Sequence, residues 1–270
     1  MDSPLQELGL LAMASTDLYR SALSVVNRRN TITGVVYKND PTIMAWELMN
    51  EARCTSDPSG RTIQAWIQEM ASYVKSIDQN HLLEAGLEGF YGRSSKRMTG
   101  INPGSNLGTD FITNNLIHEI DFATVHSYPD IWLPSFSEQQ RHSFLNKWLN
   151  THIQDAHAIL GKPLLFAEFG KCSKDRNFEP SQRDKFFYLV YSRIYKSASR
   201  GGVAAGGLFW QLLADGMDSF QDGCGIILDK DRSTANVIAH EAFKMYRVRK
   251  TFSRVMRYRM WSRARARRNP

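Results

Sequence analysis

A chain of 270 residues, of which 42% are hydrophobic and six are tryptophan, has room for one large domain or two small ones and is not a largely disordered protein. No apolar run approaches the ~20 residues that a transmembrane helix needs, and the acidic residues in "MDSPLQELGLLAMAS" make the N-terminus a poor secretory signal peptide. The net charge of +7 comes from residues 241–270, which hold 11 basic residues and one acidic residue, whereas the rest of the chain holds 23 basic and 26 acidic residues.

The three cysteines, Cys54, Cys172 and Cys224, are widely spaced and include no CxxC pair, so the ligand spacing of a zinc site is absent. They allow at most one disulfide bond. No Gly-rich phosphate loop (GxGxxG or GxxxxGKS/T) occurs, and we predict neither a metal nor a cofactor. No Asn-x-Ser/Thr sequence is present, so glycosylation gives no indication of secretion.

Residues 6–29 are predicted to form a helix, and "RNTITGVVYKNDP" leads from it into the first strand. From there on, short apolar segments alternate with amphipathic ones. The expected strands are residues 43–49, 82–87, 121–126, 163–168 and 206–211, and the expected helices are residues 60–77, 138–160, 181–200 and 233–246. This alternation predicts an α/β fold with a parallel sheet.

Each predicted strand ends on polar or aromatic residues, as expected where a barrel of parallel strands presents its active site. These residues are Asn50 and Glu51, Glu88, His126 with Ser127 and Tyr128, Glu168, and Trp210 with Gln211. A doubly wound sheet usually carries a Gly-rich phosphate loop, so we predict instead an α/β fold of the (β/α)8 TIM-barrel type. Eight βα units take roughly 250 residues, and only five strands can be recognised in the sequence. We therefore expect an incomplete barrel, with about the last five βα units and the first three missing.

Glu51 and Glu168 are candidates for a carboxylate pair that hydrolyses a glycosidic bond. In such a pair one carboxyl group gives a proton to the leaving oxygen, and the other, ionised, attacks or stabilises the anomeric carbon. If the two lie about 5–5.5 Å apart, the configuration is retained through a covalent glycosyl-enzyme. The first and fourth predicted strands face each other across a barrel mouth, which allows that separation.

Four more residues complete the predicted site. Asn50 would bond a sugar hydroxyl, His126 and Tyr128 would orient the carboxylates, and Trp210 would stack on a sugar ring. Each residue has a plainer alternative. A strand-end glutamate is more often solvated or ion-paired, the tryptophan could belong to the core, and the histidine and tyrosine could only cap the rim. For Glu88 a structural salt bridge is favoured over sugar binding.

Five segments of the chain carry a family pattern: "DPTIMAWELMNEARCTSDPSGRTIQAWIQEMASYVKSID", "NHLLEAGLEGFYG", "IDFATVHSYPD", "LLFAEFGK" and "GGLFWQLLADGMDSF". Over roughly residues 20–243 they strongly resemble plant endo-β-1,4-mannanases of glycoside hydrolase family 5. The resemblance implies a (β/α)8 barrel and retaining hydrolysis of mannan, glucomannan or galactomannan in plant cell walls. By motif it assigns a substrate-binding amide to Asn50, the acid/base to Glu51, the His-x-Tyr pair to His126 and Tyr128, the nucleophile to Glu168 and the sugar-stacking tryptophan to Trp210.

Three features depart from that family. Ala52 stands where the family usually has proline after Asn-Glu, and we expect the loss of the fixed φ to loosen the loop. The resemblance starts at the helix before the fourth barrel strand, so the chain is interpreted as N-terminally truncated, without the family's active-site arginine and signal peptide. The Arg-rich tail has no counterpart in the family.

We therefore expect an N-terminal helix region at residues 1–29, a partial glycoside hydrolase barrel at 30–246 and a disordered Arg-rich tail at 247–270. The favoured function is endo-hydrolysis of β-1,4-mannosidic linkages by an enzyme secreted to the cell wall. The alternative is an inactive relic or gene-model fragment with residual sugar binding, because open sheet edges would make the chain poorly stable. A third hypothesis is binding of nucleic acid or a membrane surface by the tail; we favour a solvated tail that binds anions only non-specifically.

Overall fold

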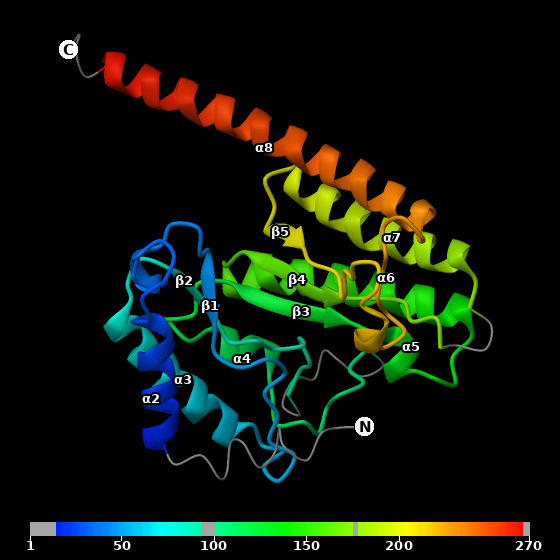
Figure 1. Ribbon diagram of the computed structural model, residues 1–270, viewed down its shortest axis with the longest axis horizontal. Helices are drawn as coiled ribbons and strands as arrows, with labels where there is room; N and C mark the ends of the chain where they lie inside the picture. The colour runs from blue at the N-terminus through cyan, green and yellow to red at the C-terminus, as the bar shows by residue number, and fades with distance from the viewer. Residues whose placement is uncertain (1–14, 93–94, 96–100, 175–177, 267–270) are drawn as a thin grey trace. The chain divides into compact units, whose positions relative to one another are not determined.

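The computed structural model describes the backbone of residues 15–92, 95, 101–174 and 178–266 (Figure 1). The chain divides into two compact units, Met1–Glu168 and Phe169–Pro270. The division falls inside a strand rather than in a linker. The domain boundaries predicted after residues 29 and 246 are not tested by this division, and they stay predictions.

The first unit alternates helices with short strands, as expected for an α/β fold. In chain order it contains α2 (Ser15–Val26), a 3-10 turn (Tyr37–Asn39), β1 (Ala45–Glu47), α3 (Arg61–Ile77), β2 (Leu82–Glu84), α4 (Phe111–Asn115), β3 (Ala123–Ser127), α5 (Pro129–Trp132), α6 (Glu138–Asp155), a π-helical turn (Ala156–Leu160), and β4 (Leu164–Phe169), whose last residue belongs to the second unit. The four strands predicted in this part are confirmed, and their ends differ from the prediction by at most three residues. The short helices α4 and α5 were not predicted.

Parallel pairing joins β1 to β2 in a two-stranded sheet, and β3 and β4 belong to a separate sheet. The register pairs of the β1–β2 ladder are Ala45–Leu82, Trp46–Leu83 and Glu47–Glu84. Further along, the His126 N–H donates to the Glu88 carbonyl oxygen at 2.9 Å, and β3 is in turn hydrogen-bonded to β4. Because the carboxyl ends of parallel strands lie at one edge, the residues that follow these strands gather there.

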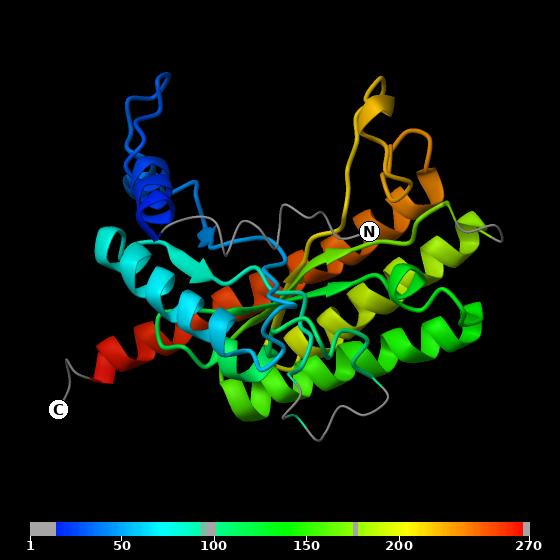
Figure 2. The ribbon, with the colours of Figure 1, turned by 90° about the horizontal axis from the view of Figure 1, so that it is seen from below.

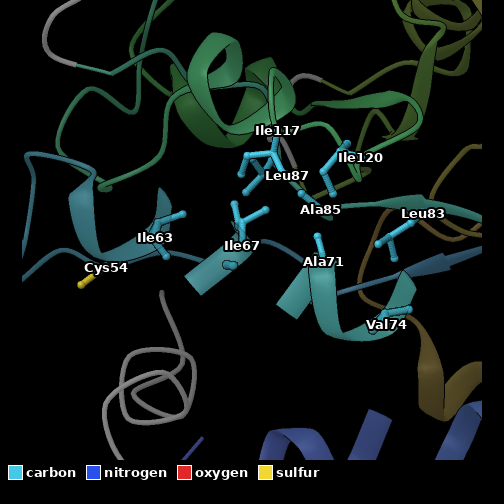
Figure 3. Packing of buried hydrophobic residues seen from close by; sticks show 11 residues of the cluster. Cys54, Ile63, Ile67, Ala71, Val74, Leu83, Ala85, Leu87, Ile117 and Ile120 are labelled. Atoms are coloured by element: carbon cyan, nitrogen blue, oxygen red, sulfur yellow. The ribbon is translucent and has the colours of Figure 1, made fainter. Parts of the chain in front are cut away.

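Helix α3 turns one apolar face toward the strands. Its buried residues recur every three or four positions, the period of one helical face: Ile63, Ile67, Met70, Ala71 and Val74. All but the methionine share a cluster with residues that include Leu83, Ala85, Leu87, Ile117 and Ile120 (Figure 3). Burying one such isoleucine completely stabilises the fold by about 1.5–3 kcal/mol.

Helix α6 supports the carboxyl end of β3. It begins at a capping box, in which Ser137 accepts from the Gln140 amide and the Gln140 side chain accepts from the Ser137 amide. Its inner face buries Trp148 completely, and the indole Nε1 of that residue donates to the carbonyl oxygen of His126 at 3.0 Å. The helix thereby holds the backbone from which the His126 side chain extends.

The second unit contains α7 (Pro180–Ala198), β5 (Ala204–Gly207), a 3-10 turn (Asp218–Phe220) and α8 (Arg232–Ala266). Figures 1 and 2 both show α8 lying along α7. The fifth predicted strand exists, but it covers residues 204–207 rather than 206–211. It stops at the Gly206-Gly207 pair, which has no side chains to support a longer strand.

One disulfide bond, between Cys172 and Cys224, closes a loop within the second unit. Cys54, in the first unit, is a buried free thiol. The prediction that three cysteines form at most one disulfide is therefore confirmed.

Helix α8 differs from the prediction for the C-terminal end. We expected a helix over residues 233–246 and a disordered tail over 247–270, whereas α8 continues to Ala266. Arg, Met, Ala and Lys make up most of this segment, all of them good helix formers, and glycine and proline are absent until Pro270. Residues 267–270 lie outside the described residues. Among the helices that the structure does describe, none is both long and apolar enough to cross a membrane.

Replacing Ile67 by alanine should lower the free energy of unfolding by about 2–5 kcal/mol, because the substitution leaves a cavity beneath α3. Ile32→Ala is the matched control, since Ile32 is 94% exposed, and it should change the free energy by less than about 0.5 kcal/mol. Urea unfolding followed by circular dichroism measures both. Equal effects of the two substitutions would contradict the packing of α3 on the strands.

Candidate active site

The backbone after β1 places Glu51 at the strand edge. Its N–H donates to the carbonyl oxygen of Gly86 at 2.7 Å, so the chain beyond β1 stays attached to the chain beyond β2. Glu51 has a φ of 52°, and among the described non-glycine residues it alone has a positive φ. This left-handed conformation is costly for a residue with a side chain and is often found at functional sites.

Glu51, His126 and Glu168 form a compact cluster within the first unit. One ligand atom of each lies within 4.8 Å of those of the other two. His126 Nδ1 is 2.8 Å from Oε1 of Glu51 and 3.7 Å from Oε2 of Glu168, and the Tyr128 hydroxyl donates to Glu168 Oε2 at 2.8 Å. The structure therefore brings together four of the six predicted site residues.

A fifth member of the cluster, Arg53, was not predicted. Its Nε and Nη2 donate to the two carboxylate oxygens of Glu88 at 2.8 and 2.7 Å, and Nη2 also lies 3.2 Å from Oε2 of Glu51. The prediction of a structural salt bridge for Glu88 is thus confirmed. The sequence gives no signal for Arg53, which lies in the loop after β1.

Burial and charge together shape the ionisation of this cluster. Burial lowers the pKa of His126, but the hydrogen bond to Glu51 and the charges of Glu168, Glu51 and Glu88 outweigh it, so the pKa is raised above its ordinary value. Burial raises the pKa of Glu168, and the charge of His126 and the hydrogen bond from Tyr128 offset part of this increase. Burial raises the pKa of Glu88 to about 7 against the opposing hydrogen bond from Arg53.

The other two predicted site residues, Asn50 and Trp210, make none of the cluster contacts described above. Asn50 precedes Glu51 and is exposed. Trp210 belongs to the second unit, where it is 42% exposed, its Nε1 donates to Asp222 Oδ2 at 2.6 Å, and its amide donates to the Phe169 carbonyl oxygen. The tryptophan is therefore not a core residue, and the roles of both residues stay predictions.

The cluster suits chemistry that needs one protonated and one ionised carboxyl group. The Glu51 and Glu168 side chains are each 19% exposed, whereas His126 is 2% exposed, so the carboxylates face solvent and the imidazole lies behind them. The same three groups could offer ligands to a metal ion. The bonds from His126 to Glu51 and from Tyr128 to Glu168 account for the arrangement without one.

Glu51→Gln should lower the pKa of His126, because it removes the charge that accepts the imidazole hydrogen bond. The His126 ring signals in a ¹H–¹⁵N NMR titration measure this pKa. Glu119→Gln is a matched carboxylate-to-amide control, since Glu119 bonds to Gln68 away from the cluster, and it should leave the titration unchanged. An unchanged His126 titration in Glu51→Gln would contradict the observed contact.

Comparisons with known proteins cover most of the chain. Residues 12–217 match the profile of the family described as GH family 5 beta-mannosidase-like. The chain is 61% identical over 250 residues to mannan endo-1,4-beta-mannosidase 7 of Arabidopsis thaliana, a match that covers 92% of this chain and 58% of that protein. It is 56% identical over 233 residues to mannan endo-1,4-beta-mannosidase 1 of Oryza sativa subsp. japonica, covering 86% of this chain and 54% of that protein.

Solved structures agree with these relatives. The endo-beta-1,4-mannanase from Thermotoga petrophila matches with a TM-score of 0.72 and 31% identity, over 89% of this chain and 54% of that one. The endo-1,4-beta-mannanase from Rhizomucor miehei matches with a TM-score of 0.67 and 29% identity, over 83% and 60%. The fold is thus of the (β/α)8 TIM-barrel type, and the chain spans little more than half the length of the two plant relatives. Because the profile matches well over half of its residues, the chain belongs to the glycoside hydrolase (GH) family 5 beta-mannosidase-like family.

Proposed function

We propose that the protein is a mannan endo-1,4-β-mannosidase that cleaves β-1,4-mannosidic linkages within mannan, glucomannan and galactomannan with retention of configuration. The observation that carries the proposal is the pair of carboxylates, Glu51 and Glu168, whose oxygens lie within 4.8 Å of each other. Such a short separation favours a nucleophile over an intervening water molecule. The printed names of the plant relatives support the substrate class.

In the first step, Glu51 donates its proton to the glycosidic oxygen while an oxygen of Glu168 attacks the anomeric carbon. The bond from that carbon to the leaving sugar breaks, and a covalent mannosyl-enzyme forms. The Tyr128 hydroxyl steadies Glu168 by its hydrogen bond, and His126 holds Glu51 in place. The two carboxyl groups are thus held by different donors before the substrate arrives.

In the second step, Glu51, now ionised, accepts a proton from a water molecule. The oxygen of that water attacks the anomeric carbon and displaces Glu168, which restores both carboxyl groups. Two inversions at one carbon give net retention. No cofactor is needed at either step.

Two exposed residues are proposed to bind the sugar, one by a hydrogen bond and the other by stacking. Asn50 would donate or accept a hydrogen bond at a hydroxyl near the reacting carbon. Trp210 would offer its ring face, which 42% exposure leaves partly open to solvent. By family resemblance we propose that the enzyme acts outside the cell, on the wall.

The extent of the barrel remains a prediction. The described residues include five strands, and that these are the last five of eight is not tested. The loosening of the loop after Glu51, expected because Ala52 replaces proline, likewise stays a prediction, although Ala52 is buried in the α3 cluster.

A chain that binds mannan without turnover would match the alternative, an inactive relic with residual sugar binding.

Glu168→Ala should abolish the release of reducing sugar from glucomannan, and Glu51→Gln should reduce it by about 10²–10⁴-fold, because general acid–base catalysis contributes that much. Glu241→Gln is the control, since this buried carboxylate pairs with Lys244 in the second unit and should retain activity. Activity that survives Glu168→Ala would exclude Glu168 as the nucleophile. Mannan binding without hydrolysis by the unmodified chain would favour the inactive alternative.

Retention is tested separately by ¹H NMR of the products in the first minutes of reaction. We expect the β-anomer of the newly formed reducing end to appear before mutarotation produces the α-anomer. An initial α-anomer would show inversion and would exclude the covalent intermediate.

A further inference from the structure

The exposed indole of Trp210 is hydrogen-bonded to a carboxylate of the same unit. Its Nε1, the only polar atom of the side chain, donates to Oδ2 of Asp222 at 2.6 Å. A hydrogen bond to an ionised acceptor is shorter and roughly twice as strong as one between neutral groups. The contact therefore holds one edge of the ring in a residue that is 42% exposed.

Asp222 is itself attached to a folded loop. Its other carboxylate oxygen, Oδ1, accepts from the Cys224 amide at 2.8 Å, and Cys224 forms the disulfide bond with Cys172. Gly223 lies between these two loop residues, and its carbonyl oxygen accepts from the Ser173 amide at 2.8 Å and from the Ser173 hydroxyl at 3.1 Å. One covalent bond and two hydrogen bonds thus attach the segment that carries Asp222 to the segment that follows β4.

The backbone that carries the indole is held by separate hydrogen bonds. The Trp210 amide donates to the Phe169 carbonyl oxygen at 3.0 Å. In the next residues, the Gln211 carbonyl oxygen accepts from the Ile226 amide at 2.8 Å, and the Leu213 amide donates to the Ile226 carbonyl oxygen at 2.9 Å. Because the backbone and Nε1 are both fixed, the two side-chain torsions of Trp210 have little freedom left, and the exposed part of the ring keeps one direction.

The surroundings of Asp222 keep its carboxyl group ionised. Burial raises the pKa of Asp222, but hydrogen bonds from Trp210, from the Cys224 amide and from Gln211 outweigh burial, so the pKa lies below its ordinary value. The acceptor is therefore charged at neutral pH. A single hydrogen bond adds only modestly to the stability of a fold, whereas a ring that is fixed in advance loses less freedom when a ligand covers it.

We propose that Asp222 positions the Trp210 ring as a preformed platform for a sugar ring. Asp222 acts through the tryptophan, so it is a positioning residue and not a catalytic one. The proposal deepens the proposed function, and it rests on the sugar-stacking role that Trp210 has there. A side chain that is already ordered before the sugar arrives favours affinity by about 3–10-fold.

Two substitutions of Asp222 test the contact without any sugar. Asp222→Asn keeps one oxygen as a neutral acceptor, whereas Asp222→Ala removes both acceptors. In ¹H–¹⁵N spectra, the indole Nε1–H signal of Trp210, assigned by its loss in Trp210→Phe, should move upfield and exchange faster with solvent in Asp222→Ala, and less so in Asp222→Asn. Asp215→Asn is the matched control, since Asp215 pairs with Lys230 in the same unit, and it should leave the signal in place.

The Ser173 amide signal shows whether the loop stays folded in these variants. If it moves in Asp222→Ala, the asparagine variant decides the contact instead. An indole signal that stays at its original position when Asp222 is replaced and the loop is intact would overturn the proposal.

Calorimetric titration with mannotetraose tests what the positioned ring does. The host chain carries Glu168→Ala, so that the sugar is not hydrolysed. In this host, Asp222→Ala should weaken binding by about 3–10-fold, and Asp215→Asn should leave it unchanged. In a host that also carries Trp210→Ala, Asp222→Ala should have no further effect, because Asp222 acts through the ring.

The outcomes separate this proposal from the proposed function. An equal loss of affinity with and without the Trp210 ring would show a general structural role of Asp222 and would overturn the proposal, while the proposed function would stand. Absence of mannotetraose binding in the host would overturn the sugar-binding role of Trp210 and with it the platform. In that case the indole signal would still decide whether Asp222 holds the ring.

Discussion

One backbone hydrogen bond, from the Glu51 amide to the Gly86 carbonyl oxygen, determines where the proposed acid/base stands. The ladder between β1 and β2 has already ended when the chain reaches this point, and the bond joins the two segments together with the Arg53–Glu88 salt bridge. It coincides with the positive φ of Glu51 and with a glycine whose Cβ would collide with the Met49 carbonyl oxygen. A strained residue after β1 therefore depends on a residue without a side chain after β2.

The cluster around that bond is a row of alternating acidic and basic side chains. Glu88, Arg53, Glu51 and His126 follow one another, each within hydrogen-bonding distance of the next. Burying any one of these groups alone in its charged form would cost several kcal/mol, and a neighbour of opposite charge offsets much of this cost. The row is stable only if its backbone is held, and α6 contributes by donating from Trp148 to the carbonyl oxygen of His126.

Much of this site could be predicted because its residues follow apolar strands, and strand ends meet at one edge of a parallel sheet. Glu51, His126, Tyr128 and Glu168 all carry that signal. Arg53 and Asp222 do not, since an arginine and an aspartate in loops are unremarkable until the neighbouring segments are in place. The early end of β5 could have been predicted from the Gly206-Gly207 pair, which has no side chains to support a longer strand. In the C-terminal segment, the high positive charge led us to expect disorder. The structure shows a helix there instead, in agreement with the helix-forming tendency of arginine and alanine.

The bond between Cys172 and Cys224 links the protein to the redox state of its surroundings. It closes a loop across 52 positions of the sequence, and on the chain-entropy model such a cross-link stabilises the folded state by about 4 kcal/mol. Disulfides of this kind persist in oxidising compartments and are reduced where glutathione is abundant. The second unit would therefore lose its disulfide bond in a reducing cytosol and keep it in the cell wall. The stability of that unit thus depends on the compartment in which the chain matures.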